Sequence, residues 1–210
     1  MTRGTVIRTL ATPTAFVAGM VFDTRSVWTS DAVANTINQV SLQTGANTKV
    51  FSAPGGISSR ALAWDGKSIW ASDNSTDLIY QISPIDGTII KSFSSPGSSP
   101  LALAWDGNSL WYTDNFSDLI YQLSPTDGTV LKSFAFPAGA TNAVGIEFMG
   151  HNLLLQDATS DLVYMIDIRD GTVIWSFAST SASPSVVMFD GRTLWVFDIA
   201  AGAAKQLSLN

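Results

Sequence analysis

LAWDGNSLWYTDNFSDLIYQLSPTDGTVLKSF, from Leu103 to Phe134, decides the fold because the chain contains a near copy of it. The preceding copy, from Leu62 to Phe93, reads LAWDGKSIWASDNSTDLIYQISPIDGTIIKSF. Fainter copies complete a set of five, whose equivalent aromatic residues are Phe22, Trp64, Trp105, Phe148 and Phe189. These positions are 41 to 43 residues apart, and a period in the low forties predicts about four strands per repeat.

Each repeat has the apolar alternation of strands, and turn residues separate its apolar runs. In the third repeat we expect strand a at 101–105, strand b at 109–113, strand c at 119–124 and strand d at 129–134. The Asp106-Gly107 step supplies the positive φ values that a two-residue hairpin needs. Pro125 cannot donate a hydrogen bond to a neighbouring strand and so ends strand c.

The two ends of the chain carry complementary parts of one repeat. GTVIRTLATP from Gly4 matches the strand d segment GTIIKSFSSP from Gly87, and KQLSLN from Lys205 matches the strand c segment YQISPI from Tyr80. A ring protects its edge strands by pairing the first strand with the last. The prediction is therefore an all-β fold, a five-bladed β-propeller with four antiparallel strands per blade, in which the N-terminal strand closes the last blade.

A chain of 210 residues, 46% of them hydrophobic, is long enough for one core, so we expect a single domain over residues 1–210. The blades are predicted at residues 15–53, 59–95, 100–136, 143–179, and 185–210 together with 4–11. One strand b position is occupied in turn by Trp28, Trp70, Trp111, Leu154 and Trp195. A set at one repeat position is expected to pack each sheet against the next.

The charge and composition exclude several classes of partner. A net charge of −6 without a Lys or Arg cluster argues against nucleic acid or an anionic membrane surface, and no run of apolar residues is long enough to insert into a membrane. Without Cys there is no disulfide or thiolate metal site. The Ser, Thr, Asp and Trp richness resembles secreted bacterial β-domains. We expect an extracellular or cell-surface monomer, although the first residues lack the apolar stretch of a signal peptide.

An aspartate ends strand b in every repeat, forming a ring of Asp31, Asp73, Asp114, Asp157 and Asp198. One interpretation is that each carboxylate accepts backbone hydrogen bonds within its own turn. The alternative is that clustered oxygens bind Ca²⁺ or a similar hard cation. The candidate ligands are then Asp73, Asp77, Asp114, Asp118, Asp157 and Asp161, in three Asp-x-x-x-Asp segments. No other cofactor is expected.

The loops predict which face of the ring binds a ligand. The b to c and d to a loops share one face, and the d to a loops vary in sequence while the opposite hairpins repeat Asp-Gly. Variable loops on a rigid ring commonly carry binding residues. The predicted ligand-binding residues are Asp31, Asp73, Asp114, Asp157, Asp198, Asn74, Asn115 and Phe116.

The fourth repeat departs from the others. Glu147, the only Glu among 17 acidic residues, stands where two other repeats have Ala63 and Ala104. A carboxylate near the axis must be hydrated, paired or protonated, and it is the single catalytic candidate. His151 falls in the a to b hairpin, and one His cannot build a metal cage or a Ser-His-Asp triad.

The segments WDGxSLWxxD and IYQLSPxDGTVxxSF resemble bacterial propeller repeats of the NHL-like, YVTN-type and glutamine cyclotransferase-like groups over nearly the whole chain. The cyclotransferase-like family is itself five-bladed, and this resemblance implies a catalytic Glu in a Thr-x-Gly-Leu-like stretch on an inner strand. The nearest counterpart is AVGIEF, residues 143–148, in which the Glu stands at a different offset from the Gly.

The sequence is compatible with three functions. The leading hypothesis is a non-enzymatic module that binds a glycan or another protein through the face with the b to c and d to a loops. The first alternative is a cyclotransferase-like or other carboxylate-dependent enzyme that uses the central channel. The second is an architectural domain of a larger surface protein.

Overall fold

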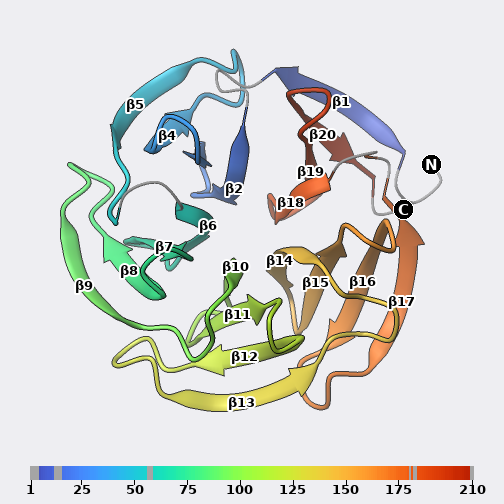
Figure 1. Ribbon diagram of the computed structural model, residues 1–210. Coiled ribbons are helices and arrows are strands. Elements are labelled where there is room, and N and C mark those ends of the chain that lie inside the picture. Colours follow the sequence, from blue (N-terminus) through green and yellow to red (C-terminus); the bar gives the residue numbers. More distant parts are fainter. Residues whose placement is uncertain (1–4, 12–15, 56–58, 180, 182–183, 209–210) are drawn as a thin grey trace.

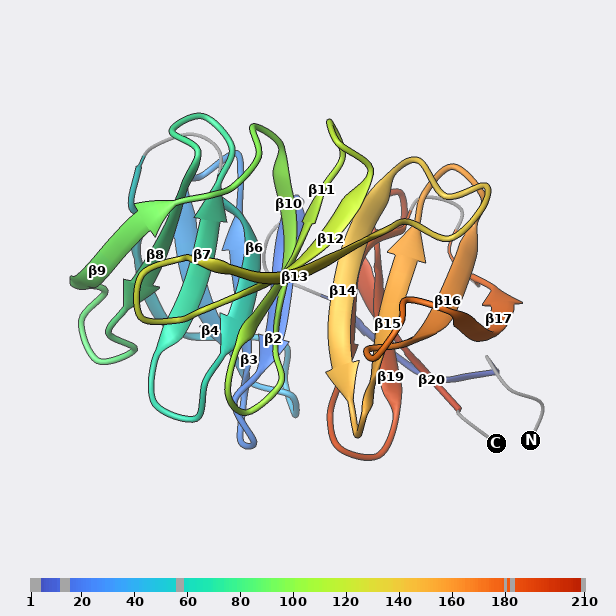
Figure 2. The same cartoon turned by 90° about the horizontal axis from the view of Figure 1, so that it is seen from below.

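The structure is a computed structural model that describes residues 5–11, 16–55, 59–179, 181 and 184–208. Its strands form five four-stranded antiparallel sheets arranged radially around one axis (Figure 1). Seen from the side, the inner strands run across the thickness of the disc and connect two faces made of loops (Figure 2). The described residues contain no helix long and apolar enough to cross a membrane. The predicted five-bladed propeller is confirmed.

The blades follow one another along the chain, each running from strand a near the axis to strand d at the rim. Blade one contains β2 (Val17–Phe22), β3 (Val27–Asp31), β4 (Thr36–Val40) and β5 (Asn47–Ser52). Blade two contains β6 (Ser59–Trp64), β7 (Ile69–Asp73), β8 (Leu78–Ile82) and β9 (Ile89–Ser94). Blade three contains β10 (Pro100–Trp105), β11 (Leu110–Asp114), β12 (Leu119–Leu123) and β13 (Val130–Ala135). Blade four contains β14 (Ala143–Met149), β15 (Asn152–Asp157), β16 (Leu162–Asp167) and β17 (Val173–Ala178).

Blade five joins the two ends of the chain. It contains β18 (Pro184–Phe189), β19 (Leu194–Asp198), β20 (Ala203–Leu207) and, as its strand d, β1 (Val6–Ala11). The register places Thr9 opposite Lys205 and Leu10 opposite Ala204. β1 and β20 lie side by side in both views (Figures 1 and 2), so the predicted closure by the N-terminal strand is confirmed.

The a to b hairpins have two-residue loops, shifted by one residue from the prediction. Asp106 donates its N–H to the carbonyl of Ser109 at 3.1 Å, so the loop residues are Gly107 and Asn108, and not the Asp106-Gly107 step. Gly107 has a φ of 97°, which glycine adopts without steric cost. In blade one the equivalent residue is Thr24, with a φ of 77°. A β-branched residue is strained in that conformation.

The core lies in the five seams between blades, as the strand b pattern predicts. Trp111 is fully buried and packs against Ile146, Leu153 and Ile166 of blade four. Leu154, which replaces Trp in blade four, packs against the inner and middle strands of blade five. The remaining members of this position make the equivalent contacts in their own seams, namely Trp28, Trp70 and Trp195. Strands d alternate between partly buried and exposed residues at the rim.

A second aspartate in four of the blades anchors the tryptophan. In blade three, Asp106 Oδ2 accepts hydrogen bonds from Trp111 Nε1 at 2.8 Å and Ser109 Oγ at 2.6 Å, and Gln122 of strand c donates to Ser109 Oγ at 2.7 Å. We call these four residues the hairpin anchor. The same set recurs as Asp23, Ser26, Trp28 and Gln39, as Asp65, Ser68, Trp70 and Gln81, and as Asp190, Thr193, Trp195 and Gln206.

Blade four replaces the whole hairpin anchor at once, by Met149, Asn152, Leu154 and Met165. The joint change has a physical reason, because a carboxylate left without the indole N–H would carry an unsatisfied charge beside the core. Met149 and Leu154 therefore differ from the other repeats as parts of a single joint change with a structural cause.

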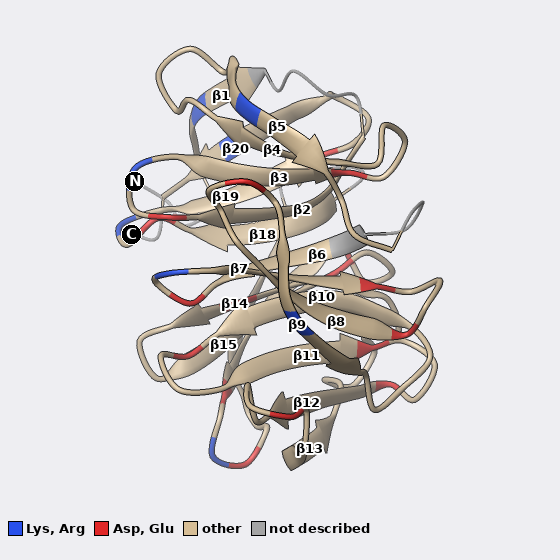
Figure 3. Cartoon of the chain, turned by 90° about the vertical axis from the view of Figure 1, so that its left-hand side faces the viewer, with Lys and Arg blue, Asp and Glu red and all other residues tan. Residues whose placement is uncertain are grey.

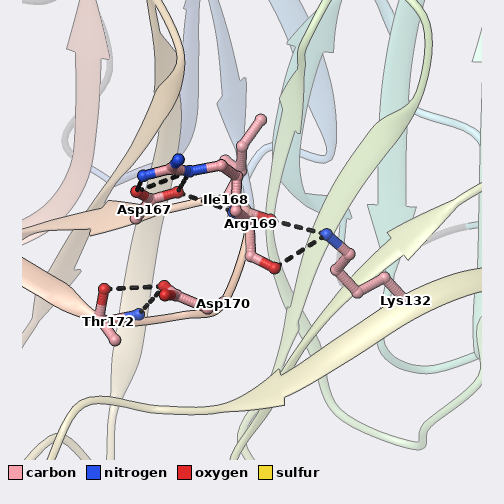
Figure 4. Close-up of polar contacts among 6 residues, drawn as sticks. All are labelled: Lys132, Asp167, Ile168, Arg169, Asp170 and Thr172. Carbon is pink, nitrogen blue, oxygen red and sulfur yellow. Dashed lines mark hydrogen bonds and ion pairs between the residues drawn. The ribbon is translucent and has the colours of Figure 1, made fainter.

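Cations on the outer strands connect neighbouring blades. Lys132 of β13 donates to the carbonyl oxygens of Ile168 and Arg169, in the c to d turn of blade four, at 2.9 and 3.2 Å (Figure 4). Lys49, Lys91 and Arg8 reach the next blade in the same way. In blade four this position is Trp175, which packs against the seam with blade five. Strands c and d of blade five are the last and first strands of the chain, so no c to d turn joins them to receive a cation.

Candidate functional site

The ring has two faces, which we call the loop face, with the d to a and b to c loops, and the hairpin face, with the a to b and c to d hairpins. In Figure 3 most charged residues lie in loops and at strand ends, with further Lys and Arg on outer strands. The channel between the faces is lined by the inner strands β2, β6, β10, β14 and β18.

The five aspartates of the strand b ring lie beneath the loop face, between 0% and 7% exposed. Asp114 Oδ1 accepts the N–H of Ser117 at 2.7 Å, and its Oδ2 accepts the N–H of Ser99 at 2.8 Å and the hydroxyl of Tyr112 at 2.7 Å. Burial alone would raise the pKa of Asp114, but these hydrogen bonds outweigh it and hold the pKa below its usual value. This carboxylate joins the b to c turn to the preceding d to a loop.

The other members of the ring make related contacts. Asp31 accepts two backbone N–H groups of its own turn, both at 2.8 Å, and Asp73 accepts the N–H and hydroxyl of Ser75. Asp157 accepts N–H groups from both loops, and Asp198 forms an ion pair of 2.7 Å with Lys205. The structure thus places these predicted ligand-binding residues inside turns, where they organise the loop face without lining its surface.

The second residue of each Asp-x-x-x-Asp segment has a backbone role. Asp77, Asp118 and Asp161 have φ between 55° and 56°, and Asn35 and Gly202 occupy the same position with φ of 55° and 58°. Asn, Asp and Gly tolerate this left-handed conformation best, which explains the residue types without a metal.

The cation hypothesis stays a prediction. No three His, Cys, Asp or Glu of the described residues gather closely enough to bind a metal ion. In blade two, however, Asp73 Oδ2 and Asp77 Oδ1 are buried without a hydrogen-bond partner among the described atoms. These two oxygens identify blade two as the place where a cation is best sought.

The loop face has a cavity of about 200 Å³ at the mouth of the channel, which we call the loop-face cavity. Its lining is apolar with an amide and a hydroxyl, from Phe16, Val17, Ala18, Leu101, Asn142, Val144, Pro184, Ser185 and Ile199. None of these residues is charged. The cavity therefore suits a neutral ligand that offers both apolar surface and hydrogen-bonding groups.

Asn142 is held in place by two neighbours. Its N–H donates to Asp157 Oδ2 at 2.6 Å, and its side-chain Oδ1 accepts from Asn115 Nδ2 at 2.9 Å. Because Oδ1 accepts, the amide N–H₂ is the group left to donate, and it makes no hydrogen bond with another described residue. Predicted residue Asn115 thus positions Asn142 and does not line the cavity itself.

The remaining predicted residues lie on the loop face outside the cavity. Phe116 is 83% exposed in the b to c turn of blade three, and Asn74 is partly buried at the equivalent of Asn115. The sequence analysis did not identify Asn142 and Ser185. Asn142 lies in a variable d to a loop and Ser185 lies at the start of the strand that follows another, so the variability of these loops was the available signal.

At the hairpin-face end of the channel, a second cavity of about 50 Å³ contains Glu147. The wall around it consists of Val21, Phe22, Ala63, Trp64, Leu103, Ala104, Trp105 and Phe189. We call Glu147 together with Phe22, Trp64, Trp105 and Phe189 the channel collar. Burial among these side chains raises the pKa of Glu147 from 4.5 to about 8, although the N–H groups of Phe148 and Phe189 partly oppose this rise.

His151 lies on the hairpin face, as expected, and is exposed. It borders an open hollow of about 370 Å³ with Asn152 and Asp167. The Asp167 carboxylate is already paired with Arg169 at 2.6 Å (Figure 4), and this pair holds the pKa of Asp167 at about 2.

The fold and both cavities define a five-bladed β-propeller with a channel that differs at its two ends. The glutaminyl cyclase of Myxococcus xanthus has a similar fold, with a TM-score of 0.83 and 15% identity over 98% of this chain and 96% of the cyclase. Two structures of virginiamycin B lyase from Staphylococcus aureus, one of a catalytically inactive variant with quinupristin, give TM-scores of 0.59 and 0.57. Each is 18% identical, over 88% of this chain and 63% of the lyase.

These likenesses confirm the resemblance to bacterial propellers at the level of the fold. No protein-family model matches the sequence, and no curated protein matches it either.

Proposed function

We propose that this propeller is a binding module that takes a neutral, hydroxyl-rich ligand, such as a glycan, in the loop-face cavity. The observation that carries the proposal is the uncharged lining of that cavity, with the Asn142 amide held by Asn115 on an otherwise apolar wall. Sugars present apolar C–H faces and hydroxyl groups together, so they match such a wall. A location outside the cell belongs to the same proposal.

The loop face has further features that support recognition of an extended ligand. Phe116 and Val33 project from the b to c turns with exposures of 83% and 80%. An exposed aromatic residue can stack on a sugar ring or an apolar side chain at low entropic cost. The buried aspartates beneath keep these turns rigid, which reduces the entropy lost on binding.

A cyclase activity is not part of the proposal. In the resemblance to the cyclotransferase-like family, the catalytic Glu belongs to a Thr-x-Gly-Leu-like stretch, whereas here Glu147 follows Gly145 by two residues. Val144, directly before Gly145, lines the loop-face cavity, and Glu147 lies at the other end of the channel. The similar fold alone does not transfer the chemistry.

Glycan-array screening of the whole chain tests the proposal, with three variants. Ile199→Trp fills the cavity and is expected to abolish binding. Asn142→Ala removes one hydrogen bond to the ligand, and its loss should weaken binding about tenfold, since such a bond contributes on the order of 1 kcal/mol or more. Asn108→Ala, an exposed asparagine on the hairpin face, is the matched control and should bind normally.

Three outcomes would overturn the proposal. An array without binding would remove the glycan as ligand, and capture of a protein partner that depends on Asn142 would replace the ligand class. Equal effects of Asn142→Ala and Asn108→Ala would show that binding occurs away from the loop-face cavity.

A further inference from the structure

The channel collar combines one carboxylate with four aromatic side chains, at the end of the channel opposite the loop-face cavity. The residues equivalent to Glu147 in the other blades are apolar, namely Val21, Ala63, Ala104 and Met188. The small Ala63 and Ala104 leave the space that forms the cavity in front of the carboxylate. The other four blades fold with an apolar residue at this position, so the blade structure itself does not require an acid there.

Among the side chains that the structure describes, none on the surrounding inner strands is a cation that could pair with the carboxylate. β2, β10, β14 and β18 contain no Lys, Arg or His, and Arg60 of β6 stands four residues before Trp64, toward the loop face. Within the described part of the chain, the Glu147 side chain accepts backbone N–H groups alone, from Phe148 at 3.2 Å and from Phe189. Two carboxylate oxygens can accept about four hydrogen bonds, so acceptor capacity remains.

We propose that the channel collar binds the primary ammonium group of an unbranched alkylamine, with Glu147 accepting its N–H groups and the aromatic residues surrounding the cation. Attraction between a cation and aromatic faces adds to the charge-assisted hydrogen bond. A cavity of about 50 Å³ exceeds the space that one water needs, so it accommodates the ammonium group and the first carbons of its chain.

A primary ammonium fits this site better than a quaternary one. Tetramethylammonium has no N–H donor, so it would exclude water from the carboxylate without replacing the lost hydrogen bonds. An alcohol of the same length would lack the charge that both the carboxylate and the aromatic rings attract. The preference for an amine over these two analogues is therefore specific to the proposed geometry.

Binding is linked to the proton on Glu147. The raised pKa means that the acid is mostly neutral at pH 7, and the ammonium must displace its proton. The affinity should therefore rise about tenfold per pH unit up to about pH 8 and then level off.

Other ionisable groups near the collar belong to the a to b hairpins. Asp23, Asp106 and Asp190 have lowered pKa values, because their hydrogen bonds outweigh burial, so they stay ionised over the same range. The rest are Asp65, bonded to Trp70, the cations Arg25, Lys67 and Arg192, and His151 of blade four. His151→Gln is the control that removes the histidine from the pH profile.

The test is a titration of the whole chain with n-butylammonium chloride, observed through the side-chain carboxyl signal of ¹³C-labelled glutamate. Because Glu147 is the only Glu, this spectrum contains one such resonance. We expect the amine to shift that resonance and to lower its apparent pKa, and we expect n-butanol and tetramethylammonium to bind at least about tenfold more weakly.

In calorimetric titrations, Glu147→Gln should reduce the affinity for n-butylammonium above pH 8 at least about tenfold and abolish the pH dependence of that affinity. His151→Gln should change neither. Circular dichroism confirms that both variants are folded. Titrations with spermidine and with Nα-acetyl-lysine amide, which keeps its side-chain ammonium, then distinguish a free polyamine from a lysine side chain as the natural source. A glutamate resonance that n-butylammonium does not move, or an affinity that Glu147→Gln leaves unchanged, would overturn the proposal.

Discussion

Glu147→Gln is predicted to stabilise the protein at alkaline pH and to leave its stability unchanged at acidic pH. Burial raises the pKa of Glu147 from 4.5 to about 8 in the folded state, while the unfolded chain keeps the ordinary value. The folded protein therefore binds one more proton between these two values. The stability that comes from this group is complete below about pH 4.5 and is lost as the pH rises to about 8.

The pKa difference sets the size of the effect. At 1.36 kcal/mol per pKa unit, the full span corresponds to on the order of 5 kcal/mol. Glu147 keeps some contact with water in the channel collar, so we expect about 2 to 4 kcal/mol. Gln has the shape of the protonated acid and does not titrate, so the variant avoids this loss.

Urea denaturation of both proteins at a series of pH values measures the effect as the difference between their unfolding free energies. The difference cancels the contribution of the aspartates, whose lowered pKa values make their stabilisation disappear at acidic pH. A difference that is the same near pH 5 and above pH 8 would refute the reasoning, because it would show that Glu147 ionises in the folded state as freely as in the unfolded one.

Three further predictions concern the turns and anchors of the ring. Asp106→Ala leaves the Trp111 indole N–H without its acceptor and should lower the unfolding free energy by about 1 to 3 kcal/mol. Asp167→Ala removes one partner of an ion pair on the same face whose Arg169 side chain is exposed, and it should change the unfolding free energy by less than about 1 kcal/mol in urea denaturation. Thr24→Gly removes the strain of a β-branched residue at positive φ in the blade-one hairpin. It should raise the unfolding free energy by up to about 1 kcal/mol and therefore raise the thermal midpoint; a lower midpoint would show that Thr24 is not strained. Calorimetric titration with Ca²⁺ should give heat that Asp73→Asn with Asp77→Asn abolishes, and the absence of both heat and a thermal shift would end the cation hypothesis.

The architecture could be predicted from the sequence because it is repeated. A period of 41 to 43 residues and the match between the two chain ends leave a closed ring as the arrangement that pairs every strand. The strand bounds follow to within about a residue, since Pro125 and the Asp-Gly steps mark the same turns in several blades. The observed a to b loop lies one residue after the predicted one. The sequence pattern shows that the loop needs glycine, but not which of the two loop positions the glycine occupies.

The candidate site could be predicted only in part. The loop face stays a prediction as the binding face. The aspartates that drew attention to it are buried in turns, because a carboxylate that caps a turn and one that binds a ligand have the same periodicity. Asn142 and Ser185 come from loops without a repeat, and their approach to one cavity depends on the ring geometry. Glu147 was identified as an exception, while the collar around it required the structure.

Hydrogen exchange of β1 tests the central claim most directly, because the pairing of β1 with β20 is what closes the ring. The amides of 6–11 should exchange as slowly as those of 130–135 in β13, the strand at the same position in blade three, and those of 203–207 as slowly as 119–123 in β12. Deleting residues 1–11 should then expose 203–207 to fast exchange. Fast exchange of 6–11 in the intact protein, with 130–135 protected, would contradict the closed ring.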